Sequence, residues 1–144
     1  MTEAFPLHSM DEQILIQNDL FVLVLPREMI YQHHLLLIPL RQSAHTFLDL
    51  TETELAAMHK LLDITIEKFA NDSSFEYSGY NLFCNNGSMH AGQHVNHFHM
   101  HVFVRSNVEG VSPYELLRDS KAWVKLGSKK WNENKIALVG RLSS

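Results

Sequence analysis

The sequence predicts an α+β fold, in which about five antiparallel strands are covered on one face by a long helix and a second, C-terminal helix. Five strand-sized apolar segments are present, a long helical pattern follows the third, and strands and helices do not alternate regularly. No G-x-G-x-x-G segment occurs, which argues against a nucleotide-binding doubly wound sheet. The 144 residues contain no repeat and no Pro/Gly-rich linker, so a single domain over 1–144 is expected.

Turn-forming residues separate the expected strands. These strands are residues 14–16, 20–25, 34–38, 77–84 and 95–104. The first two flank Gln17-Asn18-Asp19, a spacing that predicts an antiparallel hairpin. Pro39 closes the third, because proline cannot donate to a strand ladder. Asn-Asn-Gly-Ser at 85–88 and Ala-Gly at 91–92 separate the last two.

Capping residues mark the start of both expected helices. Thr51 and Glu54 form a Thr-x-x-Glu capping box, and an apolar stripe at helical spacing follows. The stripe consists of Leu55, Met58, Leu62, Ile66 and Phe69. The second helix is expected to start at Ser112, with Pro113 in its first turn. Its expected buried face is Leu116, Leu117, Trp123 and Val124.

Composition excludes several classes of protein. The longest apolar runs are strand-sized, and the N-terminus lacks the layout of a signal peptide, so no membrane span and a cytoplasmic location are expected. Cys84 is the only cysteine, which rules out an intrachain disulfide. The net charge is −4, and the eight bases of residues 73–144 are too weak a basic footprint for a protein that binds duplex nucleic acid.

Histidine is the unusual component. Five of the ten histidines fall within twelve residues: His90, His94, His97, His99 and His101. Side chains alternate along a strand, so the last three share one face while Phe98, Met100 and Val102 share the other. The apolar face can anchor this strand on the helices, which leaves the imidazoles to line the opposite surface. Neutral imidazoles suit nucleophilic and acid–base chemistry near neutral pH.

A metal site is the alternative use of such a row. His97 and His101 lie roughly 13 Å apart along an extended strand, whereas tetrahedral zinc needs ligand nitrogens at about 2.0–2.1 Å. All three histidines of the row therefore cannot easily share one ion. Two of them together with His34 or His94 could, so this alternative stays open.

Three ordered segments resemble the histidine triad (HIT) family of nucleotide hydrolases and transferases. Residues 97–103 read HFHMHVF, which matches the family's His-φ-His-φ-His-φ-φ motif. Upstream, NNGS at 85–88 and AGQ at 91–93 resemble the family's Asn-x-Gly and Gly-Gln stretch. HLLLIPLR at 34–41 resembles its His-φ-φ-φ-φ-Pro-x-Arg segment. The resemblance covers about residues 13–105 and leaves 106–144 as a C-terminal extension.

The resemblance implies a hydrolase that attacks the α-phosphate of a nucleotide. By position, His99 is the nucleophile and forms a covalent nucleotidyl-histidine, which water then hydrolyses. His97 orients the ring of the nucleophile, His101 contacts phosphate and assists the leaving group, and His34 supports the cluster. Because His101 is present where the uridylyltransferase branch has glutamine, the chain resembles the hydrolase branch. The resemblance implies no cofactor and no metal.

The resemblance also implies substrate-binding residues. Those expected at the phosphates are Asn85 or Asn86, Gly92, Gln93 and His94. His94 stands where the family usually has Ser or Thr. After the second strand, where the family usually has an Asp or Asn that contacts the ribose, the sequence has Leu-Pro-Arg-Glu, and Glu28 is the possible substitute.

The expected activity is that of a nucleotide phosphoramidase or a dinucleoside polyphosphate hydrolase. Its substrate would be a purine nucleotide or a dinucleotide polyphosphate, and a homodimer is expected because many relatives join their sheets. Two alternatives remain open: a nucleotide-binding regulatory protein with little turnover, motivated by His94 and Glu28, and a histidine-based metal-binding protein.

Overall fold

The computed structural model describes residues 1–30, 32–108, 112–118 and 124–143. Five antiparallel strands form the main sheet. In spatial order they are β1 (Ile14–Gln17), β2 (Phe21–Val24), β4 (His34–Pro39), β6 (Met100–Ser106) and β5 (Tyr77–Phe83). A separate two-stranded sheet pairs β3 (Glu28–Met29) with β7 (Val124–Lys125). The α+β class and the five-stranded antiparallel sheet predicted from the sequence are confirmed.

The β1–β2 hairpin is closed by the side chain of Asn18. Its Oδ1 accepts hydrogen bonds from the backbone N–H groups of Leu20 and Phe21 at 3.0 and 2.9 Å. Its Nδ2 donates to the carbonyl of Ala57, 2.9 Å away in the long helix α1 (Glu52–Ala70). One turn residue therefore fixes both the hairpin and its distance from the helix.

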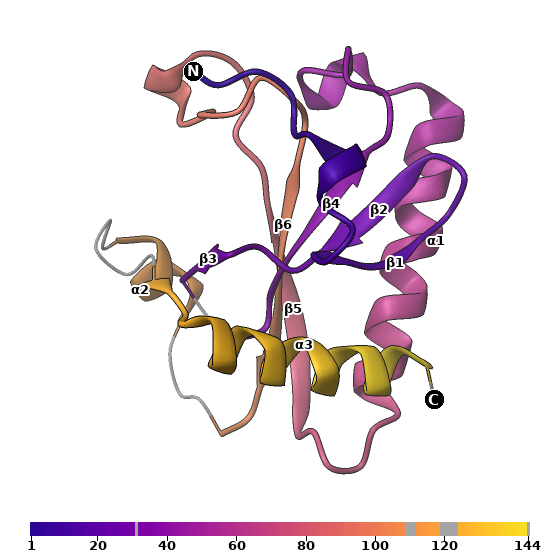
Figure 1. The fold of residues 1–144 in the computed structure, drawn as a ribbon, viewed down its shortest axis with the longest axis vertical. Helices are drawn as coiled ribbons and strands as arrows, with labels where there is room; N and C mark the ends of the chain where they lie inside the picture. Colours follow the sequence, from indigo (N-terminus) through magenta and orange to yellow (C-terminus); the bar gives the residue numbers. More distant parts are fainter. Residues whose placement is uncertain (31, 109–111, 119–123, 144) are drawn as a thin grey trace.

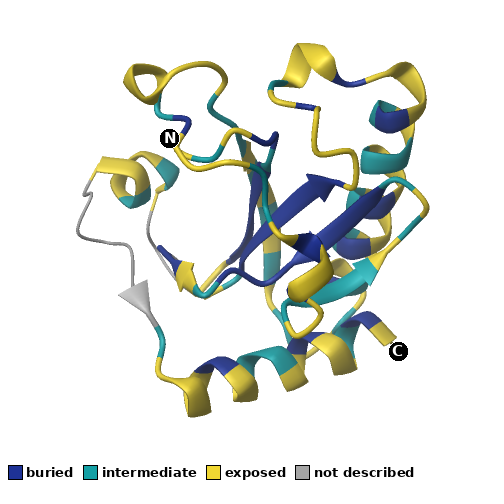
Figure 2. Ribbon diagram, turned by 45° about the horizontal axis from the view of Figure 1, so that its top comes forward, coloured by how far each residue is buried: buried dark blue, intermediate teal, exposed yellow. Residues whose placement is uncertain are grey.

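Helix α1 begins as its capping box predicts. The Glu54 N–H donates to Thr51 Oγ1 at 3.1 Å, and the Thr51 N–H donates to Glu54 Oε1 at 2.9 Å. All five residues of the expected stripe pack in the main core. This core lies between the sheet and two helices, α1 and α3 (Ser128–Ser143), as Figures 1 and 2 show.

The C-terminal region differs from the prediction. The short helix α2 (Pro113–Arg118) starts where expected, but none of its residues is buried and Leu117 is 41% exposed. The apolar face predicted for it is therefore wrong at Leu117, whereas Trp123 lies outside the described residues. Core packing is supplied instead by α3, a helix that the sequence analysis did not predict, through Trp131, Leu138 and Leu142.

The opposite face of the sheet carries a second, smaller cluster. Val22, Val24, Leu36 and Ile38 pack there against the N-terminal residues Leu7 and Met10. In Figure 1 the chain begins beside the region that precedes β6, and the N-terminal segment then crosses the sheet toward β1. Helices α1 and α3 thus cover one face of the sheet, and the N-terminal segment covers part of the other face.

Candidate active site

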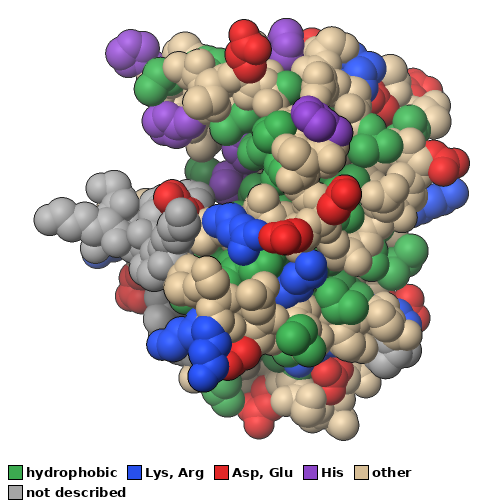
Figure 3. Space-filling model, in the orientation of Figure 1, with side chains coloured by type: hydrophobic (Ala, Val, Ile, Leu, Met, Phe, Trp, Pro, Cys, Tyr) green, Lys and Arg blue, Asp and Glu red, His purple; other side chains and the backbone are tan. Residues whose placement is uncertain are grey.

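A cavity of about 780 Å³ lies on the sheet face opposite helices α1 and α3. Four histidines line it: His34, His94, His99 and His101. Figure 3 shows a hollow in this side of the molecule, with histidine side chains above it and inside it. The volume is within the usual range for a small-molecule site.

The ring of His99 is held so that one nitrogen stays free. His99 Nδ1 lies 2.9 Å from the backbone carbonyl oxygen of His97. Because a carbonyl oxygen only accepts hydrogen bonds, Nδ1 carries the proton and Nε2 keeps its lone pair. Burial lowers the pKa of His99, and the charge of His94 lowers it further, while the bond to His97 opposes both. His99 therefore presents a neutral imidazole in the cavity at neutral pH.

His34 and His101 form a hydrogen-bonded pair with an assigned proton order. The Ile30 N–H donates to His34 Nδ1 at 3.3 Å, so the proton of His34 is on Nε2. His34 Nε2 then donates to His101 Nδ1, 2.8 Å away, which places the proton of His101 on Nε2. Burial lowers the pKa of His34 to about 3 and that of His101 to about 2. Both rings are neutral at pH 7.

His97 is fully occupied by backbone groups. Its Nδ1 accepts the Phe5 N–H at 3.2 Å, and its Nε2 donates to the Pro39 carbonyl at 2.8 Å. Of the three imidazoles expected to line the face opposite the helices, His99 and His101 line the cavity there, whereas His97 is 0% exposed and lies outside the lining. Backbone partners from the N-terminal segment and the end of β4 make this burial possible. His97 positions His99 through its carbonyl oxygen, whereas its ring is bonded elsewhere.

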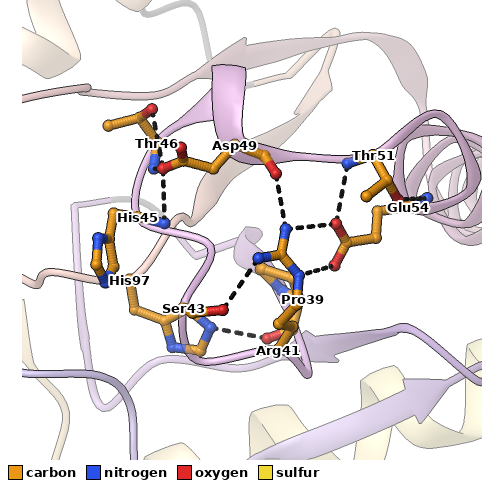
Figure 4. A network of polar contacts seen from close by, with 9 residues as sticks. All are labelled: Pro39, Arg41, Ser43, His45, Thr46, Asp49, Thr51, Glu54 and His97. Carbon is orange, nitrogen blue, oxygen red and sulfur yellow. Dashed lines mark hydrogen bonds and ion pairs between the residues drawn. The ribbon is translucent and has the colours of Figure 1, made fainter.

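Arg41, the last residue of the His-φ-φ-φ-φ-Pro-x-Arg segment, fixes the loop after β4. It pairs with Glu54 at 2.8 and 3.1 Å and donates to the Asp49 carbonyl at 2.7 Å and to Ser43 Oγ at 3.0 Å (Figure 4). Glu54 also caps α1, so this network ties the helix to the end of β4. Arg41 lies two residues after Pro39, whose carbonyl accepts from His97, and it is outside the cavity lining.

The N-terminal segment is part of the site. Thr2 forms an isolated β-bridge with Val95, and its N–H donates to the His94 carbonyl at 2.8 Å. The Phe5 ring lies edge-on to His99, with ring centroids 5.2 Å apart. Sequence reasoning missed these contacts, because no local pattern in residues 1–10 indicates a partner more than ninety residues away.

The loop before the triad brings only some of its candidate substrate-binding residues to the cavity. Asn85 and Gly92 line the cavity, and Asn85 Nδ2 donates to the Gly92 carbonyl at 3.1 Å. Asn86 lies outside the cavity lining and accepts the Phe47 N–H at 2.7 Å. Gln93 is 1% exposed and also lies outside the lining.

The amide of Gln93 is used to hold two loops together. It accepts from the Gly87 N–H at 2.7 Å and donates to the carbonyls of His45 and Val95 at 2.6 and 3.0 Å. The structure therefore brings Asn85, Gly92 and His94 to the cavity but not Asn86 or Gln93. The buried amide of Gln93 has a supporting position instead, because its donors and acceptor satisfy backbone groups.

Helix α3 of the C-terminal extension supports one wall of the cavity. Pro26, Arg27 and Glu28 line this wall, as do Leu117 and Arg118 of α2. Trp131 Nε1 donates to the Pro26 carbonyl at 3.0 Å, and the Arg27 guanidinium lies 3.6 Å from the centre of the Trp131 ring. Helix α3 thus fixes the segment that presents Glu28 to the cavity.

A metal site has no support in the described part of the chain. Among these residues, no three His, Cys, Asp or Glu side chains form a group that could hold a metal ion. The short contact between His34 and His101 is a hydrogen bond in which each ring has an assigned tautomer.

The model of the HIT domain matches residues 8–108, well over half of the sequence. The chain belongs to the HIT domain family. The match includes β1 to β6, His34 and all three triad histidines. Among curated proteins, none matches the sequence significantly.

Several solved HIT structures share the fold. A histidine triad nucleotide-binding protein from Sulfolobus tokodaii aligns with a TM-score of 0.69 at 19% identity, over 91% of this chain and 83% of that one. A diadenosine triphosphate hydrolase from Plasmodium falciparum gives 0.67 at 17% identity, over 91% and 76%. A zinc-bound histidine triad family protein from Mycobacterium smegmatis gives 0.66 at 20%, over 90% and 83%. These similarities place the chain in the HIT fold.

Membrane insertion by a helix finds no support in this HIT domain. Within the described ranges, every helix is too short or too polar to cross a bilayer.

Acidification is expected to destabilise this HIT domain. The pKa of His34 and of His101 lies far below 6.5 in the folded state, so only the unfolded chain takes up these protons between pH 6.5 and about 3. Stability is therefore highest above pH 6.5 and falls below it, by about 2 kcal/mol per histidine between pH 7 and 5. Urea unfolding at the two pH values measures this loss.

Two variants provide the control. His34→Leu removes one buried histidine and should flatten the pH dependence by about 2 kcal/mol, as linkage requires. His90→Gln changes an exposed ring and should leave it as in the wild type. Equal pH dependence in all three proteins would contradict the neutral state assigned to the pair.

Gly92→Ala is expected to disturb the cavity wall at Asn85. Gly92 has a φ of 93°, and an added Cβ would lie 2.9 Å from Cγ and Nδ2 of Asn85. The left-handed backbone costs alanine about 1–2 kcal/mol, and the clash displaces the Asn85 amide from the cavity. We expect lower stability in urea together with weaker nucleotide binding by titration calorimetry.

Gly140→Ala is the matched control, because a Cβ there meets no atom within 4 Å. It lies in α3, where alanine favours helix formation, so stability should stay equal or rise and binding should not change. Nucleotide binding by Gly92→Ala as tight as by Gly140→Ala would show that Asn85 does not hold the ligand.

Proposed function

We propose that this HIT protein hydrolyses nucleotides at the α-phosphate, as a phosphoramidase or dinucleoside polyphosphate hydrolase, through a covalent intermediate on His99. The observation that carries the proposal is the hydrogen bond from His99 Nδ1 to the His97 carbonyl. It fixes the tautomer that leaves Nε2 as a nucleophile in a cavity of the right size for a nucleotide.

The reaction has two displacements at phosphorus. The Nε2 lone pair of His99 forms the P–N bond while the bond to the leaving group breaks. The ring becomes an imidazolium, and its Nδ1–H stays bonded to the His97 carbonyl, which stabilises the positive charge. Water then attacks phosphorus, the P–N bond breaks, and the electron pair returns to Nε2, so that a nucleoside monophosphate is released.

Phosphate oxygens would be held by neutral donors. His101 presents its Nε2–H, because Nδ1 accepts from His34. Asn85 has a second amide hydrogen beyond the one that it donates to Gly92. A fixed donor at the position where charge develops needs no reorganisation during the reaction, which is the most effective form of electrostatic stabilisation.

The rest of the cavity suits a nucleoside. Apolar side chains of Phe5, Met10, Val24 and Leu36 can pack against a base, and we infer a purine from the size of the cavity. Glu28 lines the same wall, where its carboxylate can accept hydrogen bonds from ribose hydroxyls. The cations on this wall are Arg27 and Arg118, which can attract a polyphosphate.

Incubation with adenosine phosphoramidate and with diadenosine polyphosphates tests the proposal. AMP should appear from at least one of them, by chromatography, with a nucleotidyl-protein adduct trapped by rapid denaturation. Tight nucleotide binding with neither AMP nor an adduct would contradict the hydrolase proposal and favour a regulatory nucleotide-binding protein.

A cytoplasmic homodimer stays the expectation for the native protein. Strand β5 is at an edge of the sheet in the described part of the chain and exposes Tyr80 and Leu82, and such an edge can pair with a second copy. A monomer in analytical ultracentrifugation would refute the dimer without bearing on the chemistry at His99.

A further inference from the structure

When its leaving group is an amine, the proposed reaction needs a proton for that group, and the buried histidines cannot supply one readily. An amine or alkoxide leaves slowly unless an acid protonates it as the bond to phosphorus breaks. His97 has both ring nitrogens bonded to backbone groups. His99 uses one nitrogen for the His97 carbonyl and the other as the nucleophile.

The His34–His101 pair is locked in its neutral form by its hydrogen bonds. A proton added to His101 Nδ1 would face the Nε2–H of His34 across 2.8 Å. Moving the proton of His34 to its Nδ1 would in turn oppose the Ile30 N–H. The pair therefore offers a hydrogen-bond donor at His101 but resists carrying a positive charge, which limits its use as an acid.

His94 differs from these four in three respects. It is exposed, it lines the same cavity as His99, and none of the hydrogen bonds among the described residues involves its ring. Histidine is the side chain whose charge changes near neutral pH, so an exposed one can exchange protons with solvent between turnovers. It is thus the cavity histidine best able to hold a transferable proton.

The backbone of His94 is clamped by the N-terminal segment. Its carbonyl accepts from the Thr2 N–H at 2.8 Å and from Thr2 Oγ1 at 3.1 Å. The Thr2 carbonyl in turn accepts the Asn96 N–H at 2.7 Å. These bonds hold the backbone of a residue that lines the cavity, and none of them uses its side chain.

We propose that His94 is the catalytic acid of the proposed hydrolase, which protonates the leaving group when His99 attacks phosphorus. The P–N bond forms as the P–X bond breaks, the electron pair goes to X, and the imidazolium of His94 transfers one proton to X. Neutral His94 then accepts a proton from the attacking water in the second step and returns to its starting form. The inference rests on the proposed function.

The charged groups around the cavity allow this role. His99, His101 and His34 are neutral at pH 7, because burial keeps their pKa values low. The charged side chains of the cavity wall are Glu28, Arg27 and Arg118. A charge on His94 lowers the pKa of His99, which favours the neutral form of the nucleophile.

Two substrates that differ in their leaving group provide the test. An N-alkyl phosphoramidate of AMP, called the amide here, releases an amine that must be protonated. The p-nitrophenyl ester of AMP releases p-nitrophenolate, which leaves without a proton. His94→Gln should lower kcat/KM for the amide by about 100-fold or more and leave the ester within about threefold.

His90→Gln is the matched control, since His90 is an exposed histidine of the same loop outside the cavity lining. It should react with both substrates as the wild type does. Equal losses for amide and ester in His94→Gln, or no loss for either, would overturn the assignment of the acid and leave the hydrolase proposal standing. Failure of the wild type on both substrates would instead refute the proposed function, on which this inference depends.

Discussion

His99→Ala lowers the rate of AMP release by about 10⁴-fold or more while the fold is retained, because it removes the atom that forms the covalent intermediate. In the wild type the ring of His99 is held by the His97 carbonyl and lies edge-on to Phe5. His101 Nε2 carries a proton and lacks a lone pair, as its bond from His34 requires. The measurement is kcat on the most active substrate of the panel.

His59→Ala is the control for this loss, since His59 is exposed on α1, far from the cavity lining. It should keep wild-type kcat. Both variants should unfold at urea concentrations close to that of the wild type. Residual activity in His99→Ala above about one tenth of the wild-type value would show that another group, or water itself, attacks phosphorus.

Trp131→Ala is expected to lower the free energy of unfolding by about 3–5 kcal/mol, the usual cost of deleting a large buried aromatic side chain. Trp131 is 1% exposed, packs in the main core and donates to the Pro26 carbonyl. Its loss opens a cavity beneath α3 and leaves Pro26 without this partner. Because Pro26 lines the active-site cavity, we also expect KM for the nucleotide to rise.

Trp131→Phe separates these two effects. It keeps most of the buried area and removes only the indole N–H, so we expect a loss of about 1 kcal/mol. The urea midpoint of both variants and KM of each give the comparison. A stability loss below 1 kcal/mol in Trp131→Ala would mean that the C-terminal helix is a dispensable attachment to the domain.

Local patterns in the sequence predicted much of the fold and the core of the site. The alternation of His97, His99 and His101 with apolar residues correctly placed one set of side chains against the helices. The capping box of α1 and the turn at Asn18 were confirmed, since each depends on contacts within four residues. His34 was predicted as a site residue from a motif on a neighbouring strand, and in the structure its ring is hydrogen-bonded to His101.

Long-range contacts were beyond such reasoning. The role of residues 1–10 depends on pairing between Thr2 and Val95, which no periodicity encodes. Burial of His97 depends on two backbone partners from separate segments, at Phe5 and Pro39. Helix α3 did carry a signal, because its buried residues Trp131, Leu138 and Leu142 recur at helical spacing. That spacing would have predicted a third helix.

The histidines divide the work of the proposed site according to their surroundings. His97 is a structural link whose carbonyl fixes the tautomer of His99. His34 sets the proton of His101, so that the ring facing the cavity is a neutral donor. His94 is the exposed member and has a different task. In the proposed site, histidine therefore serves as a positioning residue, a nucleophile, a hydrogen-bond donor and an acid, because burial and hydrogen bonding differ at each position.

The stereochemical course at phosphorus tests the central proposal, a covalent intermediate on His99, most directly. The substrate is a nucleotide made chiral at the α-phosphorus with sulfur and an oxygen isotope, and the product is analysed by phosphorus NMR. Attack by His99 followed by attack of water inverts the centre twice, so the account predicts net retention of configuration. Net inversion would show a single displacement by water and would contradict the covalent intermediate.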